Sequence, residues 1–388
     1  MNRPLTLAAA FSTSALLLTT GCAGVTQSNK KAAGSHVIDV ESNNTECKLS
    51  QTEHESGRIA FKIKNTGDKV TEFYFYAEDG QQIMAEIENI GPGLSRDLVL
   101  QANPGTYVTA CKPGMVGKGI RGDFKVTGEK KDLGVKGVDA ATIKQATDSY
   151  AAYVKDQTSE LIEQARAFTQ AYVAGNDDEA RRLYPIARAP WERTETVAES
   201  FGDLDPKTDA READLEPGQK WTGWHLIEKD LWPPAKGYTP LTPAQRKAAA
   251  EDLMANLTTL HERVQTLTYT VDQIGNGSKG LLDEVATGKI TGEEDIWSHT
   301  DLYDFQANLD GARVAYQVLK PLLEIKDAAL SEKIGEEFTN VQELLNNYRQ
   351  GDGFVSYDQV TEAQRRVLSD AVNALAEPLS QMTGAITS

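Results

Sequence analysis

The chain has 388 residues, of which 40% are hydrophobic and 25% are charged, and its formal net charge is −17. This length suits two or three domains of about 100–200 residues each, and the composition is that of a soluble globular protein. The acidic charge argues against nucleic acid as a partner, because phosphates would be repelled, and makes cations the more natural ligand, although such a charge also simply keeps a protein in solution.

The first 21 residues have the pattern of a secretory signal peptide, with Arg3 before a short apolar run. The sequence Thr-Thr-Gly-Cys-Ala-Gly follows and resembles a bacterial lipobox, in which Cys22 becomes the lipidated first residue. Residues 22–35 are then expected to form a flexible tether. The protein is therefore expected at the outer face of the cytoplasmic membrane or in the periplasm, with the lipid anchor as its contact with the membrane.

Residues 36–128 show the period-two alternation of β-strands, interrupted by turn clusters rich in Asn, Asp and Gly. Short strands at this spacing, over about 90–100 residues, predict a β-sandwich. The expected strands span residues 58–64, 72–76, 96–100, 107–111 and 122–126.

Residues 103–115, NPGTYVTACKPGM, resemble the ligand loop of cupredoxins. In that family a Pro-Gly turn leads into a strand, then a cysteine and a methionine, whose soft sulfur atoms suit copper. The two histidines of a blue-copper centre are missing from their expected places, so the resemblance implies the cupredoxin-like fold more strongly than a copper site.

Cys47 and Cys111 are the two cysteines that remain if Cys22 is lipidated, and an exported protein meets an oxidising compartment. Two alternatives are open. The cysteines form a disulfide, or they bind a metal together with Glu72, with Met115 nearby.

Residues 129–138 are charged and contain glycine, and we interpret them as a linker. From residue 142 onward, apolar residues recur at three- and four-residue steps, which predicts helices. Residues 139–388 are therefore expected to form an all-α helical bundle after the β-sandwich. The longest predicted helices span residues 142–175, 243–273, 303–325, 330–349 and 357–382.

Acidic residues recur at helical spacing between residues 187 and 228. The segment ARAPWERTE is expected to open a helix with proline in its first turn, so that Glu192 and Glu195 share a face. A later helix carries Asp209, and His225 and Glu228 form another pair three residues apart. Di-iron carboxylate bundles use such Glu-x-x-His steps. Oxygen ligands with one imidazole favour iron or manganese and leave zinc possible.

The alternative is a purely structural role, in which these glutamates lie on solvated faces and His225 is a hydrogen-bonded core residue. Two further features are expected to be structural. Glu293, Glu294 and Asp295 form an acidic run of the kind that is most often solvated. Ser298 or Thr300 is expected to cap a helix that has Asp301 in its first turn.

Three longer stretches, residues 187–205, 224–232 and 289–311, resemble the imelysin-like family, whose peptidase label comes from a His-x-x-Glu motif. A cupredoxin-like domain followed by an imelysin-like domain, on an exported chain, resembles the EfeO family of EfeUOB-type iron-uptake systems. The resemblance implies capture of iron (Fe2+ or Fe3+) and its delivery to a membrane iron permease, with a haem peroxidase-like protein as third partner. It implies metal sites at Glu192, Glu195, Asp209, His225 and Glu228, and at Cys47, Glu72 and Cys111.

Other functions remain open beside iron capture. A zinc-dependent metallopeptidase would use His225 as ligand and Glu228 as base or ligand, but the second histidine of His-Glu-x-x-His is missing. A copper-binding or electron-transfer protein would use the cupredoxin-like domain, and an acidic bundle could also bind a polyanion through bridging cations.

Overall fold

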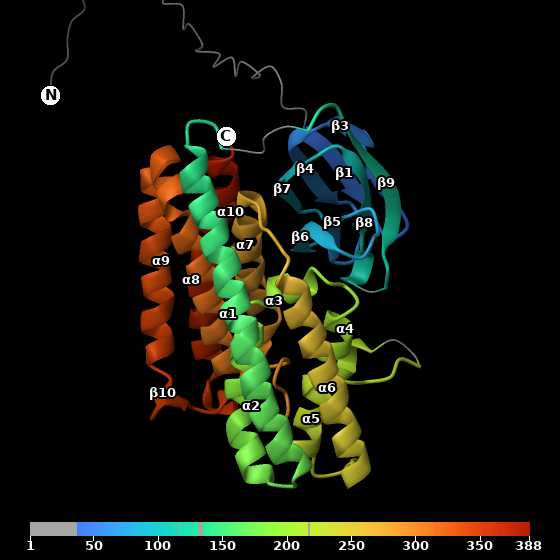
Figure 1. Cartoon of the computed structure of the whole chain (residues 1–388), viewed down its shortest axis with the longest axis vertical. Helices are drawn as coiled ribbons and strands as arrows, with labels where there is room; N and C mark the ends of the chain where they lie inside the picture. Colours follow the sequence, from blue (N-terminus) through green and yellow to red (C-terminus); the bar gives the residue numbers. More distant parts are fainter. Residues whose placement is uncertain (1–36, 116, 131–134, 216–217) are drawn as a thin grey trace, which may run out of the picture. The chain divides into compact units, whose positions relative to one another are not determined.

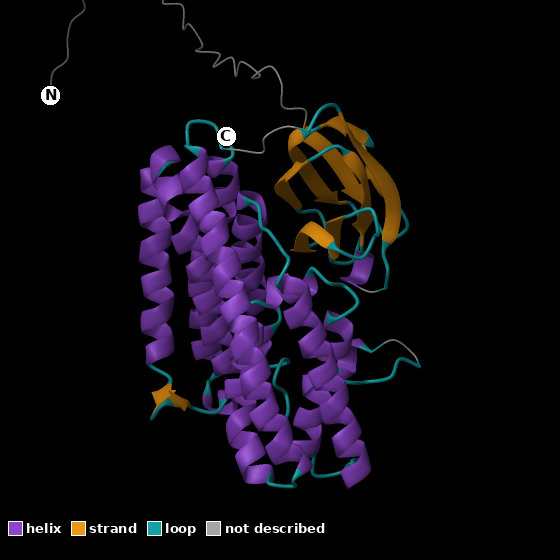
Figure 2. Cartoon of the chain, in the orientation of Figure 1, coloured by secondary structure: helices purple, strands orange, loops and turns teal. Residues whose placement is uncertain are grey.

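The computed structural model describes residues 37–115, 117–130, 135–215 and 218–388. His36–Ser388 form one compact unit, in which a β-sandwich is followed by a helical bundle (Figures 1 and 2). The predicted signal peptide, Cys22 and the tether lie outside the described residues, as does part of the predicted linker. Across the described ranges, no helix is long and apolar enough to cross a membrane.

Two sheets form the sandwich, with strand orders β2-β1-β4-β7 and β3-β9-β8-β5-β6. β1 pairs with β4, and β3 with β9, in parallel, and the other neighbouring strands are antiparallel. The strands are β1 (Val37–Ser42), β2 (Cys47–Leu49), β3 (Glu53–Glu55), β4 (Gly57–Asn65), β5 (Thr71–Tyr76), β6 (Ile83–Ile90), β7 (Ser95–Ala102), β8 (Gly105–Cys111) and β9 (Ile120–Thr127). The five predicted strands are confirmed as β4, β5, β7, β8 and β9.

Aromatic side chains fill the space between the two sheets. Phe61 on β4 contacts Phe73 and Phe75 on β5 and Phe124 on β9, with ring centroids 5.2, 5.9 and 5.5 Å away. All four rings are buried. The period-two alternation of β4 directs Ile59, Phe61 and Ile63 into this core, as the sequence pattern predicts.

The bundle comprises long helices joined by short ones. The long helices are α1 (Ala140–Val173), α2 (Asp177–Glu192), α6 (Pro243–Val264), α7 (Val271–Thr287), α8 (Asp301–Lys326), α9 (Ala328–Asn346) and α10 (Glu362–Ile386). The shorter elements that matter for the site are α3 (Glu195–Glu199), α4 (Asp205–Thr208), α5 (Trp224–Leu231) and the 3-10 turn η3 (Lys289–Thr291). A two-stranded ribbon, β10 (Arg349–Gln350) and β11 (Gly353–Phe354), follows α9.

Two helix boundaries differ from the prediction. Pro190 does not open a helix, because α2 begins at Asp177, where three acidic residues suit its first turn, and ends at Glu192. Glu192 and Glu195 therefore lie at the end of one helix and the start of the next. The predicted helix over 243–273 is two helices, because Thr270 and Gln273 form a capping box that starts α7.

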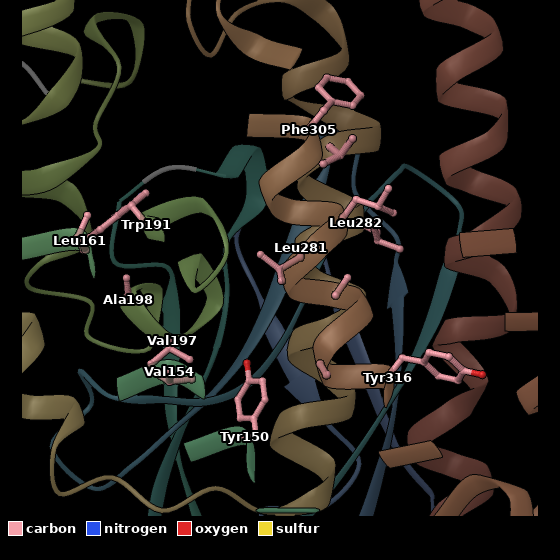
Figure 3. Packing of buried hydrophobic residues seen from close by; sticks show 14 of the residues in the cluster. Tyr150, Val154, Leu161, Trp191, Val197, Ala198, Leu281, Leu282, Phe305 and Tyr316 are labelled. Atoms are coloured by element: carbon pink, nitrogen blue, oxygen red, sulfur yellow. The ribbon is translucent and has the colours of Figure 1, made fainter. Parts of the chain in front are cut away.

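Buried apolar side chains from five helices meet in the middle of the bundle. Figure 3 shows this packing. The labelled side chains are Tyr150, Val154 and Leu161 of α1, Trp191 of α2, Val197 and Ala198 of α3, Leu281 and Leu282 of α7, and Phe305 and Tyr316 of α8. Trp191 and Trp224, among the largest fully buried side chains, adjoin the polar cluster described below and fix the helices that carry it.

Gly223 sets the distance between α4 and α5. Its φ is +89°, and a Cβ there would lie 2.1 Å from the carbonyl oxygen of Thr208. We expect Gly223→Ala to lower the free energy of unfolding by about 3 kcal/mol or more, from left-handed backbone strain plus overpacking. Gly237→Ala is the matched control, because Gly237 has φ +80° but no described atom within 4 Å of a Cβ, so about 1–2 kcal/mol is expected. Urea unfolding measures both, and equal losses would contradict the steric explanation.

The sandwich contacts the bundle through β6, β7 and α7. The backbone N–H of Gln101 donates to Asp272 Oδ2 at 2.8 Å, and Asn276 Nδ2 donates to the carbonyl oxygen of Val99 at 2.9 Å. Beside these contacts, Glu88 of β6 is hydrogen-bonded to Glu284 of α7. The Tyr74 hydroxyl lies 2.9 Å from both Glu72 and Glu88. One hydroxyl proton cannot serve two carboxylates, so a carboxyl group of this cluster must itself carry a proton.

Burial and the neighbouring carboxylates raise the pKa of Glu86 and of Glu88 to about 8. A carboxyl group with a raised native pKa contributes stability below its unfolded pKa, and that stability is lost as the pH rises through the native value. We therefore expect the midpoint temperature of unfolding to decrease as the pH is raised from about 4.5 to 8. This decrease should be smaller in a Glu86→Gln, Glu88→Gln double variant. The wild type and the double variant share Lys112, Asp205 and the other charged groups nearby, so these groups do not account for a difference between the two pH profiles.

The exposed Glu78 provides the control, since Glu78→Gln should leave the pH profile as it is in the wild type. A double variant whose midpoint falls as steeply as that of the wild type would refute the role of Glu86 and Glu88.

Candidate metal centre

The predicted sulfur site in the sandwich is wrong, and the disulfide alternative is confirmed. Cys47 of β2 and Cys111 of β8 are joined by a disulfide that links the two sheets, with their Cα atoms 5.5 Å apart. Because the thiolate is the form that binds metal, neither sulfur is available as the predicted ligand. Met115 is 44% exposed, and Glu72 is buried against the Tyr74 hydroxyl with Lys112 Nζ at 3.8 Å. The structure does not bring these four side chains together as one site.

The five predicted residues of the bundle do converge. Glu192 ends α2, Glu195 starts α3, Asp209 follows α4, and His225 and Glu228 lie on α5. All five side chains are buried, with exposures of 7% or less. The solvated-face alternative is thus wrong for these glutamates.

His225 is held in one orientation by Glu228. The ring Nδ1 of His225 is hydrogen-bonded to Glu228 Oε2 at 2.9 Å. Metal-binding histidines commonly use one ring nitrogen for the metal and donate the other N–H to a carboxylate, which fixes the ring. The contact therefore directs the second nitrogen, Nε2, toward the interior of the cluster.

His225 Nε2 faces two carboxylates. It lies 3.3 Å from Asp209 Oδ1 and 3.5 Å from Glu294 Oε1, but within the part of the chain that the structure describes it has no hydrogen bond of good geometry. Burial and Arg188 act to lower the pKa of His225, but the facing carboxylates of Asp209, Glu228 and Glu294 outweigh them and raise this pKa well above its usual value. At neutral pH the protonated form of His225 is therefore favoured, and Nε2 lies buried beside two anionic oxygens.

The second oxygen of Glu228 is fully occupied by the connection between α7 and α8. Oε1 accepts hydrogen bonds from the backbone N–H groups of Trp297 and Ser298, at 2.9 and 2.8 Å, and from the Ser298 hydroxyl at 3.0 Å. Glu228 therefore orients His225 and anchors this connection, and neither of its oxygens is free to accept a proton from water.

Arg188 ties three carboxylates together from the interior of α2. Its guanidinium donates to Asp209, to Glu192 and, at 3.2 Å, to Glu294. Burial opposes ionisation of Asp209, yet Arg188 and His225 hold its pKa well below the usual range. Burial likewise opposes ionisation of Glu294, while Lys289 and His225 lower its pKa to about 2. Both carboxylates are therefore anionic at neutral pH.

Lys289 of η3 is a second cation inside the cluster. Its ammonium donates to Glu192 Oε2 and to both oxygens of Glu195, at 2.9 and 2.8 Å. Asn308 of α8 donates to the same two glutamates, at 3.2 and 3.1 Å. Burial and the neighbouring Glu192 raise the pKa of Glu195 well above its usual value despite the opposing effect of Lys289.

The acidic run at residues 293–295 is only partly solvated, contrary to the prediction. Glu293 is exposed, but Glu294 and Asp295 are 7% and 0% exposed and belong to the cluster. Thr300 does precede α8 and Asp301 lies in its first turn, as predicted. Thr300 is the N-cap residue, as predicted, but its side chain makes no capping hydrogen bond, because the Thr300 hydroxyl donates to Asp295 and the Ser298 hydroxyl to Glu228.

Asp304 is another member that periodicity did not identify. It is fully buried in α8, with Arg188 at 3.6 Å, and neither of its oxygens has a hydrogen bond to any described residue. Burial and Asp295 raise the pKa of Asp304 well above its usual value. Glu294, Asp295 and Asp304 all fall within residues 289–311, so the family-like stretch was the available signal.

Among the described residues there are three sets of side chains whose ligand atoms, within each set, lie within 4.8 Å of one another and could hold a metal ion. They are Asp209, His225 and Glu294; His225, Glu228 and Asp295; and Glu192, Glu195, Asp209 and Glu294. The first set fits best, because it uses the unbonded Nε2 of His225 and leaves Glu228 in its orienting role. Hard oxygen atoms with one imidazole suit iron, manganese or zinc.

The fold and the cluster define a two-domain protein, with a disulfide-linked β-sandwich and a helical bundle that contains a buried carboxylate-imidazole centre. The Imelysin family model matches residues 146–382, and a Cupredoxin-like domain model matches residues 14–126. An Efem/EfeO family lipoprotein of Staphylococcus haemolyticus is 43% identical over 269 residues, covering 69% of this chain and 92% of its relative. Its Staphylococcus aureus (strain MRSA252) counterpart is 45% identical over 256 residues, covering 65% and 87%. The chain belongs to the imelysin family and is an Efem/EfeO-type member of it.

Proposed function

We propose that this protein captures iron, as Fe2+ or Fe3+, in the buried centre of the bundle and delivers it to a membrane iron permease. The observation that carries the proposal is His225 Nε2, which is buried, oriented by Glu228 and directed at Asp209 and Glu294 without a hydrogen bond to any described residue. Nε2 and the two carboxylates lie close together in a buried place without a well-formed hydrogen bond, and a metal ion that displaces the proton could bind all three.

In this proposal Asp209, His225 and Glu294 bind the ion, and Glu192 and Glu195 supply further oxygen ligands. Arg188 and Glu228 hold the ligands in place. The paired carboxylates favour hard ions, so iron is the expected cargo and Cu(I) is disfavoured. Capture and release, rather than chemical change of a substrate, is the proposed activity.

The proposed location is the outer face of the cytoplasmic membrane. The lipobox-like sequence at Cys22 and the similarity to Efem/EfeO family lipoproteins support it. An anchored capture protein would pass iron to a permease beside it, with a haem peroxidase-like protein as the third component, as the resemblance implies. Crosslinking of the anchored protein to a permease in membranes would test this arrangement.

A metallopeptidase is the second candidate, and the hydrogen bonds of Glu228 argue against it. A general base needs an oxygen within reach of the metal-bound water, whereas both oxygens of Glu228 are engaged. Cleavage of any peptide library with Zn(II) supplied, lost on His225→Ala, would revive this candidate.

Copper binding in the sandwich is the third candidate. The disulfide withdraws the thiolate that a blue-copper centre requires. An intense blue colour on adding Cu(II) to the oxidised protein would count in its favour.

Iron affinity should depend on pH in a defined direction. Because the pKa of His225 is raised, a proton on Nε2 competes with the metal at neutral pH. We expect the affinity for Fe(II) under anaerobic conditions to rise as the pH increases, by up to about tenfold per pH unit while His225 remains protonated. Calorimetry between pH 5.5 and 7.5 measures this, and a flat profile would contradict His225 as a ligand.

A further inference from the structure

Lys289 places a positive charge at the carboxylates that the proposed function assigns to the metal. Its side chain is 1% exposed, and its ammonium group uses all three of its donors on Glu192 and Glu195. The same two glutamates belong to one of the sets of ligand atoms that could hold a metal ion. A metal ion and the ammonium of Lys289 would thus compete for the same oxygen atoms.

The two internal cations differ in how firmly they are held. Arg188 lies inside α2 and its planar guanidinium bridges Asp209, Glu192 and Glu294. Lys289 lies in a three-residue turn between Gly288 and Gly292, the latter with φ +81°. Lysine is a compact charge on a flexible stem, whereas arginine is rigid and makes several directed hydrogen bonds. Lys289 can therefore leave its partners while Arg188 stays.

The charges explain why the cluster needs a removable cation. Glu192 and Glu195 converge on one point, and two carboxylates in contact repel each other strongly when buried. The ammonium of Lys289 neutralises part of this charge, and a bound metal ion would do the same. With the metal bound, the ammonium of Lys289 is no longer needed to neutralise the charge of Glu192 and Glu195.

We propose that Lys289 is an internal competitor for the metal. Its ammonium gives way when iron binds Glu192 and Glu195, and its return weakens the bound state so that iron can be released. This inference rests on the proposed function, because it concerns the same site. It assigns Lys289 the role of setting affinity and release rate, which transport requires and storage does not.

Lys289→Met in the His36–Ser388 unit tests the proposal. Methionine has a similar length and no charge. We expect Fe(II), titrated anaerobically by calorimetry, to bind about tenfold more tightly or better, because the competing charge is gone. Release of Fe(II) to excess chelator, followed by stopped flow, should slow by a similar factor. Lys279→Met is the matched control, since Lys279 is also paired with a carboxylate, Asp283, but lies outside the cluster.

Lys289→Gln provides a second variant if the methionine variant does not fold, because the amide keeps a donor for one glutamate. A folded Lys289 variant that binds Fe(II) equally or more weakly would overturn the proposal, since a purely structural lysine lowers affinity when it is removed. Absence of Fe(II) binding by the wild type would instead refute the proposed function. The two failures are therefore distinguishable.

Discussion

His225→Ala is expected to lower iron affinity by at least about 100-fold, because it removes the imidazole nitrogen that the proposed function assigns to the metal. The titration uses the His36–Ser388 unit with Fe(III)-citrate, anaerobic Fe(II), Zn(II), Mn(II) and Cu(II). His261→Ala is the control, because His261 lies on α6 and is hydrogen-bonded to Thr158, apart from the cluster. Unchanged iron binding by His225→Ala would remove the basis of the proposed function.

Variants of Glu228, measured in the same titration, distinguish whether this residue orients His225 or binds the metal directly. Loss of a group that orients a metal ligand typically costs about 10–100-fold in affinity. We expect Glu228→Ala to fall in or beyond this range and Glu228→Gln to lose less, because the amide oxygen can replace one of the two accepting oxygens, toward either His225 Nδ1 or the N–H groups of Trp297 and Ser298. If Glu228 bound the metal directly, the glutamine variant would lose as much as the alanine variant.

Loss of the Cys47–Cys111 disulfide is expected to destabilise the sandwich. The two cysteines are 64 residues apart. Closing a loop of this length lowers the entropy of the unfolded chain and so raises its free energy by about 4 kcal/mol. A Cys47→Ala, Cys111→Ala variant should therefore unfold at clearly lower urea concentration than the wild type. The double variant avoids a lone reactive thiol, and both replacements are small.

Iron binding by the bundle provides the internal control for that variant. Affinity for Fe(II) should not change, because neither cysteine belongs to the centre. A parallel loss of iron binding would show that sulfur atoms take part after all, and unchanged urea stability would contradict the structural role of the disulfide.

Periodicity located the two regions and most of the long elements, because buried faces impose periods of two and 3.6 on the sequence. It missed β6, whose Glu86 and Glu88 point toward the bundle where a polar, solvated face would be expected in an isolated sandwich. The break between α6 and α7 was present as the Thr270 capping box. The β6 error arises where one part of the chain packs on another, which local patterns do not record, whereas the break before α7 was recorded locally and was overlooked.

The candidate metal centre was likewise predicted only in part. Spacing and resemblance identified the five residues from Glu192 to Glu228, and the structure brings them together. The roles within the cluster depend on geometry that spacing cannot supply. Glu228 turns both oxygens away from a ligand position, and Glu294, from an acidic run that looks solvated, faces His225 instead.

The connection from Lys289 to Thr300 supplies one wall of the centre as a single piece of chain. It carries Lys289, whose ammonium donates to Glu192, and Glu294, whose carboxylate faces His225. It also carries the two backbone N–H groups that donate to Glu228. Other side chains of the cluster come from α2 and α5, whose Trp191 and Trp224 are buried in the core. A displacement of this one connection would therefore remove a positive charge, a candidate ligand and the support of His225 at the same time, whereas the contacts of α2 and α5 with the core do not depend on it.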